Sequence, residues 1–169
     1  MRIDEPNKII ITWTHNMVSF NHLRGRKSVA EGIVSALVYQ PGDLIVQIRD
    51  ITETDEKITD VLVFSDYRYF VTSTNEGNIC VWKYEKASNS QGEGTKKLIH
   101  IFQGHIKSIK SLQHFNKNSN VFLSASKDGT FKVWSIETLS LLYTFEFPSI
   151  FTFVTVMAGS QFIVTQNDR

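Results

Sequence analysis

The stretch that decides the fold is residues 104–134, which read GHIKSIKSLQHFNKNSNVFLSASKDGTFKVW. Residues 71–82 (VTSTNEGNICVW) align without a gap with the last part of this stretch, residues 123–134 (LSASKDGTFKVW). The alignment places Gly77 over Gly129 and Trp82 over Trp134. Self-similarity of this kind is typical of repeat architectures, in which each unit is one supersecondary structure.

Each unit has the pattern of short antiparallel strands. Residues 121–126 alternate apolar and small polar side chains, and the turn that contains Gly129 separates them from a second strand at residues 131–134. Glycine accepts the positive φ that such a turn requires. Residues 109–112 supply an earlier strand and residues 139–145 a later one. The sequence therefore predicts an all-β fold with units of four strands.

This arrangement resembles a WD40 repeat, because of the pair Gly104-His105, the run SASKDG at residues 124–129 and the pair Val133-Trp134. The resemblance implies a β-propeller of four-stranded antiparallel blades. It also implies a hydrogen-bonded structural tetrad, which in this sequence maps to His105, Ser124 or Ser126, Asp128 and Trp134. Two positions depart from the pattern: Ser135 follows the tryptophan where aspartate is usual, and His114 replaces an aromatic or aliphatic residue.

The rest of the chain is interpreted as further blades. Residues 104–148 form the best-matching blade and residues 51–103 a degraded one, with strands expected at 58–64, 69–74, 78–83 and 98–102. In the degraded blade Thr54 stands where the tetrad histidine is expected, and Glu76 replaces the turn aspartate.

Both ends of the chain are expected to be incomplete blades. Residues 1–50 have predicted second, third and fourth strands at 8–14, 33–39 and 43–48, with residues 15–30 as an insertion. Residues 149–169 have two predicted strands, at 151–156 and 162–166. The fold prediction is a WD40-type propeller segment of about three to four blades. A propeller segment of this kind is explained either by a partial gene product or by assembly with another chain.

Two polar stretches are predicted loops. Residues 85–97 (EKASNSQGEGTKK) contain few apolar side chains, and residues 23–28 (LRGRKS) concentrate three cations beside a glycine. The cationic stretch is interpreted as a solvated loop, with a phosphate or acidic-protein contact as the alternative.

Composition favours a binding protein over an enzyme. The formal net charge is only +1, which gives no overall attraction to nucleic acid or membrane. The five histidines lack the spacing of metal ligands, and Cys80, the only cysteine, is interpreted as a packed thiol. No catalytic residues, metal or cofactor are therefore expected. The lone cysteine and the absence of an apolar N-terminal segment favour an intracellular, cytoplasmic protein without membrane insertion.

The function predicted from the resemblance is a non-enzymatic scaffold that presents a propeller face to protein partners. A nucleic-acid-associated subunit and a ciliary or cytoskeletal scaffold are the alternatives, the former disfavoured by the near-neutral charge. In WD40 proteins partners often contact residues beside the turn aspartate and at the start of the first strand. These positions map to Lys57, Thr59, Asn75, Ser108, Lys110 and Lys127. Their lysines are interpreted either as a patch for acidic or phosphorylated peptides or as ordinary solvated side chains.

Overall fold

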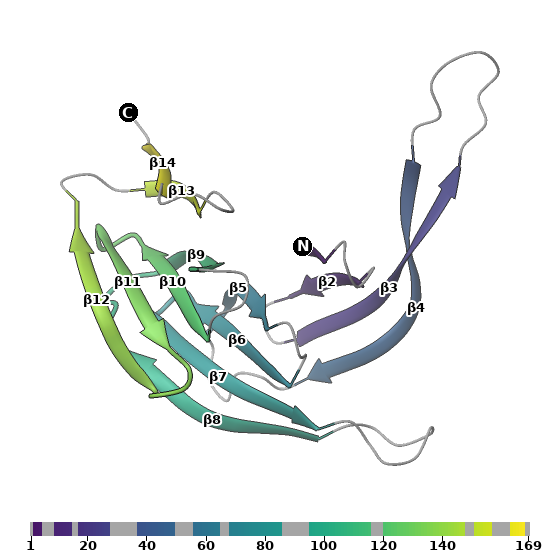
Figure 1. Ribbon diagram of the computed structural model, residues 1–169, viewed down its shortest axis with the longest axis horizontal. Coiled ribbons are helices and arrows are strands. Elements are labelled where there is room, and N and C mark those ends of the chain that lie inside the picture. Colours follow the sequence, from purple (N-terminus) through teal and green to yellow (C-terminus); the bar gives the residue numbers. More distant parts are fainter. Residues whose placement is uncertain are drawn as a thin grey trace. The chain divides into compact units, whose positions relative to one another are not determined.

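The structure is a computed structural model that describes residues 2–4, 9–14, 17–27, 37–49, 56–64, 68–85, 95–115, 120–147, 151–156 and 163–167. Every regular element in these ranges is a β-strand (Figure 1). The chain divides into two compact units, Met1–Ile51 and Thr52–Arg169, which are described separately below. The all-β prediction is confirmed.

In the part of the first unit that the structure describes, four strands form one antiparallel sheet. The strands follow one another in the order β1 (Arg2–Asp4), β2 (Ile9–Trp13), β3 (Met17–Lys27) and β4 (Leu37–Arg49). The predicted strands at 8–14 and 43–48 are confirmed, since they correspond to β2 and to part of β4.

The predicted third strand of this unit was wrong. The third strand is β3, which lies in the stretch that was taken for an insertion and includes most of the predicted cationic loop. The physical reason lies at the adjacent ends of β2 and β3, where the Thr14 amide donates to the Met17 carbonyl at 2.9 Å. β3 therefore pairs antiparallel with β2, and Val18 and Phe20 become buried opposite Trp13 and Ile11.

The described residues of the second unit form two four-stranded sheets and a strand pair, all antiparallel and all in chain order. The first sheet consists of β5 (Ile58–Val63), β6 (Tyr69–Thr74), β7 (Asn78–Glu85) and β8 (Thr95–Gln103). The second sheet consists of β9 (Ile109–His114), β10 (Val121–Ser126), β11 (Thr130–Ser135) and β12 (Ser140–Glu146). The pair consists of β13 (Phe151–Val156) and β14 (Ile163–Asn167).

The strands expected in this unit are confirmed, with one correction at a loop. Residues 85–97 were predicted to be a connection, but β7 runs to Glu85 and β8 begins at Thr95. The polar side chains at the two ends of this stretch belong to a paired hairpin, in which Glu85 lies opposite Thr95. Residues 86–94 lie outside the described residues.

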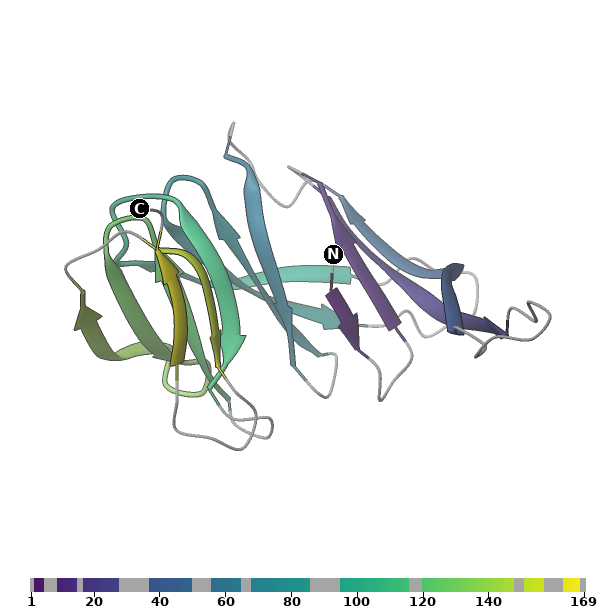
Figure 2. The same ribbon diagram turned by 90° about the horizontal axis from the view of Figure 1, so that it is seen from above.

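The core of the second unit lies between its two four-stranded sheets, which face each other in Figure 2. Phe102 of β8 is only 3% exposed and packs against Trp134 and Phe122, with ring centroids 4.7 and 6.0 Å away. The cluster is completed by apolar side chains from both sheets: Leu62, Phe64, Val71, Ile79, Val81, Ile109, Leu112 and Ile136. The sheets are therefore joined mainly by apolar burial.

Two polar contacts connect the innermost strands of these sheets. The buried Asp60 carboxylate on β5 accepts hydrogen bonds from its neighbour Val61 N at 2.9 Å and from Leu112 N on β9 at 2.8 Å. His114 of β9 donates from Nε2 to the Val63 carbonyl at 2.9 Å. A charged acceptor strengthens the first contact, so the register of β9 against β5 is fixed by directional bonds as well as by packing.

The turn glycines are required by the backbone. Gly77 has φ of +92° and Gly129 has φ of +85°, which confirms the positive φ expected at the repeat turn. A Cβ atom on Gly77 would also lie 2.6 Å from the His105 carbonyl oxygen, so the first sheet's turn packs closely on the segment before β9.

We expect Phe102→Ala to lower the free energy of unfolding by about 3–5 kcal/mol, because it leaves a cavity beside Trp134 and Phe122. Chemical denaturation at equilibrium measures this change. The control is the preceding residue on the same strand, Ile101, which is 42% exposed. Ile101→Ala should cost less than about 1 kcal/mol, and equal costs for the two substitutions would contradict the packing described.

Candidate functional site

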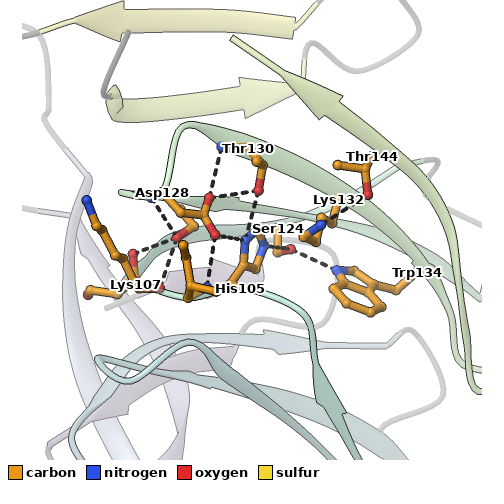
Figure 3. Close-up of polar contacts among 11 residues, drawn as sticks. His105, Lys107, Ser124, Asp128, Thr130, Lys132, Trp134 and Thr144 are labelled. Atoms are coloured by element: carbon orange, nitrogen blue, oxygen red, sulfur yellow. Dashed lines mark hydrogen bonds and ion pairs between the residues drawn. The ribbon is translucent and has the colours of Figure 1, made fainter. Parts of the chain in front are cut away.

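Four buried or partly buried side chains form one chain of hydrogen bonds at the end of the second sheet (Figure 3). The Trp134 indole Nε1 donates to Ser124 Oγ at 2.8 Å, and Ser124 Oγ lies 2.7 Å from His105 Nε2. The other imidazole nitrogen, Nδ1, lies 2.9 Å from Asp128 Oδ2. The chain joins β10 and β11 to their connecting turn and to the segment before β9.

One arrangement of hydrogens satisfies every atom in this chain. The indole can only donate and the carboxylate can only accept, so His105 donates from Nδ1 and accepts from the Ser124 hydroxyl at Nε2. The imidazole is then neutral. Burial lowers the pKa of His105 first of all, and the positive charge of Lys132 lowers it further, whereas Asp128 raises it. The net shift is downward, which keeps the imidazole in the neutral form that the hydrogen bonds require.

Asp128 joins the turn to the loop before β9. Its Oδ1 accepts from the Thr130 amide at 2.9 Å and from the Thr130 hydroxyl at 2.7 Å, and its Oδ2 accepts from the Ile106 amide at 3.1 Å in addition to His105. Burial alone would raise the pKa of Asp128, but the hydrogen bonds and the nearby histidine lower it to about 2. Asp128 is therefore a carboxylate at neutral pH and holds residues 104–106 against the turn.

Ser126, the other serine that the sequence left open for the tetrad, has a different set of partners. Its hydroxyl lies 2.9 Å from the Lys107 carbonyl and 3.2 Å from the Ser108 carbonyl, and it accepts from the Asp128 amide at 3.1 Å. The serine that contacts both Trp134 and His105 is Ser124. Ser126 instead fixes the backbone that leads into β9.

The segment before β9 passes close to the indole ring. A Cβ atom on Gly104 would lie 2.8 Å from Trp134 Cη2, so a larger residue would displace either the ring or the backbone. Lys132 lies beside them with a mostly buried stem, and its ammonium donates to Thr144 Oγ1 at 3.1 Å. The lysine therefore covers apolar surface while its charged end reaches β12.

The first sheet has only part of this series of hydrogen bonds. The Trp82 indole donates to Thr72 Oγ1 at 3.0 Å, as Trp134 donates to Ser124. Glu76 is exposed and accepts a hydrogen bond from the side chain of its neighbour Asn75. Thr54, predicted to stand in the histidine position, lies outside the described residues.

A different contact joins the turn to the loop in the first sheet. Asn78 Nδ2 donates to Glu56 Oε1 at 2.9 Å, and the Asn78 amide donates to Thr74 Oγ1 at 3.2 Å. Sequence comparison did not reveal this pair. The available signal for this contact was the ungapped alignment, in which Asn78 occupies the position of Thr130.

The six residues predicted to contact partners lie at the ends of strands in the two sheets. In the first sheet the Asn75 amide donates to the Lys57 carbonyl at 3.0 Å, and in the second the Lys127 amide donates to the Ser108 carbonyl at 3.0 Å. Thr59 Oγ1 lies 2.9 Å from Ser73 Oγ. The structure thus brings together Lys57 with Asn75 and Ser108 with Lys127.

All three lysines of the predicted patch are exposed, namely Lys57, Lys110 and Lys127. The sequence analysis missed two neighbours in the segment that Asp128 holds. Ile106 is 83% exposed, and Lys107 is also exposed. The isoleucine directly after His105 was a signal in the sequence for an exposed apolar residue. It precedes β9 and so lies outside the alternating pattern of that strand.

The described residues give little support to catalytic chemistry. Burial raises the pKa of the Cys80 thiol to about 11, with a further contribution from Glu56, so it is protonated at neutral pH. Within the described ranges, no group of three or more His, Cys, Asp or Glu side chains could hold a metal ion. The part of the chain that the structure describes also contains no helix long and apolar enough to span a membrane.

We expect Ser124→Ala to lower the free energy of unfolding by about 1–3 kcal/mol, because it deprives the buried Trp134 N–H of its acceptor and His105 of its donor. The matched substitution in the first sheet is Thr72→Val, which removes the acceptor of Trp82 while preserving the side-chain shape. It should cost less, because a shorter chain of hydrogen bonds is broken. Denaturant titration measures both, and a larger cost at Thr72 would contradict this assignment.

His105 should also make stability depend on pH. Its pKa is lower in the folded protein than its ordinary value of 6.5, so the unfolded chain binds more protons there. The stability that the neutral imidazole provides is therefore complete above about pH 6.5 and is lost as the pH falls below that value. Asp128 adds a second loss below about pH 4, because its pKa is lowered to about 2.

The measurement is the free energy of unfolding between about pH 7 and 5, compared between the wild type and His105→Gln. The wild type should lose more stability over this interval than the variant, whose side chain does not titrate. Equal slopes would show that His105 is not held neutral by its surroundings.

Comparison with known proteins places these observations in a family context. Residues 96–135 match the family model described as "WD40: WD domain, G-beta repeat". The chain is 31% identical over 83 residues to Cell division control protein 4 of Candida albicans, covering 44% of this chain and 12% of that protein. It is 31% identical over 96 residues to Eukaryotic translation initiation factor 3 subunit I of Drosophila willistoni, covering 57% of this chain and 27% of that protein.

Among solved structures, the WD40 beta propeller domain of Doa1 superposes with a TM-score of 0.64 over 98% of this chain and 46% of that one, at 15% identity. At that identity the likeness describes the fold alone. The chain spans less than half the length of each of these relatives. The resemblance to the WD40 family is confirmed: residues 96–135 match a WD40 repeat, and the chain has the fold of a partial WD40-type β-propeller.

Proposed function

We propose that this chain is a non-enzymatic interaction scaffold, in which each four-stranded sheet of residues 52–148 is one blade and the loops at the strand ends meet protein partners. The observation that carries the proposal is the fixed yet exposed segment after His105. Asp128 binds the Ile106 amide and Ser126 binds the Lys107 and Ser108 carbonyls, while the Ile106 and Lys107 side chains face solvent. Such preorganised loops lose little conformational entropy on binding.

The chemistry of this surface favours an acidic or phosphorylated peptide. Lys57, Lys110 and Lys127 are all exposed, although the whole chain has a formal net charge of only +1. The backbone bonds of Lys57 with Asn75 and of Lys127 with Ser108 hold two of these lysines at defined positions. The exposed Ile106, whose amide donates to the Asp128 that follows Lys127, adds an apolar side chain to this surface. In this proposal the protein acts in the cytoplasm as part of a protein assembly.

Nucleic acid is the second candidate partner, because the proposal rests on exposed lysines, which also bind phosphates. The same lysines would then face backbone phosphates. The two candidates differ in the density of negative charge that the surface must meet, and therefore in how steeply binding falls with salt.

The test is binding of a fluorescent glutamate-rich peptide with two phosphoserines, measured by anisotropy at about 0.05 to 0.5 M NaCl. The combined variant Lys57→Glu, Lys110→Glu and Lys127→Glu should bind about tenfold or more weakly and lose most of the salt dependence. The three substitutions are combined because each exposed ion pair contributes only a small binding free energy, which salt screens.

A control variant carries the same change of charge on other strands, at Lys83, Lys96 and Lys97 of β7 and β8. It should bind nearly as well as the wild type. Equal binding by the wild type, the combined variant and the control variant would refute the role proposed for Lys57, Lys110 and Lys127. Preference for a single-stranded oligonucleotide of similar charge would favour nucleic acid as the partner.

A further inference from the structure

The turn of the first sheet carries an exposed carboxylate close to exposed lysines. Glu76 occupies the position of Asp128 in the repeat alignment. The Asp128 side chain is only 4% exposed, because it is bound to His105 and to the segment before β9. Glu76 is exposed instead, and it accepts a hydrogen bond from Nδ2 of its neighbour Asn75. The same turn position therefore has a structural role in the second sheet and is open to a partner in the first.

Hydrogen bonds hold this carboxylate in place. The Asn75 amide donates to the Lys57 carbonyl at 3.0 Å, and the Lys57 amide donates back to Asn75 Oδ1 at 2.5 Å. The Asn75 side chain is thereby oriented, and its Nδ2 donates to Glu76 Oε1 at 2.5 Å. Glu76 is an exposed side chain with reduced freedom, so a partner that binds it loses less conformational entropy.

The same turn packs on the loop of the second sheet. A Cβ atom on Gly77 would lie 2.6 Å from the His105 carbonyl oxygen and 3.0 Å from the Lys107 carbonyl oxygen. Glu76 thus stands in the chain between a residue bonded to Lys57 and a residue packed on Lys107. Both lysines are exposed. The carboxylate is therefore held close to the backbone of two lysines, one from each sheet.

Glu76 does not neutralise these lysines by pairing with them. Within the described ranges, no lysine or arginine nitrogen lies at ion-pair distance from Glu76. A carboxylate has acceptor sites on both oxygens, and the single bond from Asn75 leaves most of them open. The open sites suit a guanidinium group, which can donate to both carboxylate oxygens at once.

The mixed charge of this surface discriminates between ligands. A purely acidic ligand is repelled at Glu76, and a purely basic one is repelled at Lys57, Lys107 and Lys127. Like charges in close contact lower affinity, so both kinds of ligand are disfavoured. A peptide with one cation between anions meets the opposite charge at each position. A nucleic-acid backbone lacks this pattern, because all of its phosphates are negative.

We propose, building on the scaffold function above, that Glu76 binds an arginine side chain of the partner peptide. Acidic or phosphorylated residues on either side of this arginine then meet the lysines. Arginine fits better than lysine, because its planar guanidinium contacts a carboxylate at two points and is more weakly hydrated. Glu76 gives this surface its sequence preference, whereas the lysines supply a general attraction to negative charge.

The test compares two labelled peptides that bind the intact protein, by fluorescence anisotropy. Both are glutamate-rich and carry two phosphoserines. One has arginine between the phosphoserines, and the other has citrulline, which has nearly the same shape without the charge. We expect the arginine peptide to bind about three- to tenfold more tightly, because of its pair with Glu76. Without that pair the lysines would repel the arginine, and the citrulline peptide would bind at least as well.

Protein variants assign the preference to one residue. Glu76→Gln keeps the size of the side chain and removes its charge. It should abolish the preference for arginine and leave the affinity for the citrulline peptide unchanged or higher, because a repulsive charge is gone. Glu137→Gln is the matched control: Glu137 is also exposed, but it follows β11 at the end opposite the Gly129 turn. It should retain the wild-type preference. Thermal unfolding confirms that each variant is folded.

Four outcomes would overturn the proposal. Equal or tighter binding of the citrulline peptide by the wild type would remove the role of Glu76 and leave that of the lysines intact. A preference for arginine that persists in Glu76→Gln would assign it to another group. Tighter binding of a single-stranded oligonucleotide with the same number of phosphates would show that the cation between anions is not recognised. Absence of binding by both peptides would overturn this proposal and the scaffold function together.

Discussion

Trp134 is the residue on which most of the second unit depends, because its indole takes part in two kinds of contact at once. The ring packs on Phe102 and so joins one sheet to the next. The N–H donates to Ser124 and so begins the chain that ends at Asp128. A buried indole N–H without an acceptor costs free energy, so the packing position is accessible to tryptophan only if a hydroxyl lies beneath it. Apolar burial and loop geometry are thereby coupled through one side chain.

The first sheet shows how this coupling loosens when some of the hydrogen bonds that link Trp134 to Asp128 have no equivalent. Trp82 keeps its acceptor in Thr72, but Glu76 lies at the surface instead of joining a turn to a loop. Asn78 and Glu56 provide a substitute contact between turn and loop. The buried Asp60 then fixes the first sheet to the second through the Leu112 amide. Directional bonds are thus retained at each junction, although the residue types differ between the repeats.

Much of the second unit could be predicted from the sequence, because its turns and its alternation coincide. The glycine turns and the two tryptophans set the register, and the strands between residues 58 and 146 follow from them. The third strand of the first unit could not be predicted in this way. Its position depends on the hydrogen bond between Thr14 and Met17. The sequence between them contains neither glycine nor proline, and a competing apolar stretch lay further along the chain.

The sequence identified the residues of the candidate site more readily than it identified the hydrogen bonds between them. Ser124 and Ser126 are both small hydroxyl residues on the same side of one strand, so alternation cannot distinguish them. The choice depends on depth: Ser124 lies within reach of the indole, and Ser126 lies at the backbone of the next segment. Asp60 was not singled out at all, because its main partner is the backbone amide of Leu112, 52 residues along the chain. A backbone partner leaves no mark in the sequence.

The lysine positions proposed for partner binding follow from how stacked sheets use their side chains. Side chains that point out of a sheet are covered by the neighbouring sheets, as Phe102 is, so they must be apolar and fitted to their neighbours. The strand ends are free of that requirement, and lysines at positions 57, 110 and 127 can be exposed there without loss of packing. The outer strand β12 departs from the first part of this rule, because Tyr143 and Phe145 have the apolar character of covered positions and the exposure of uncovered ones.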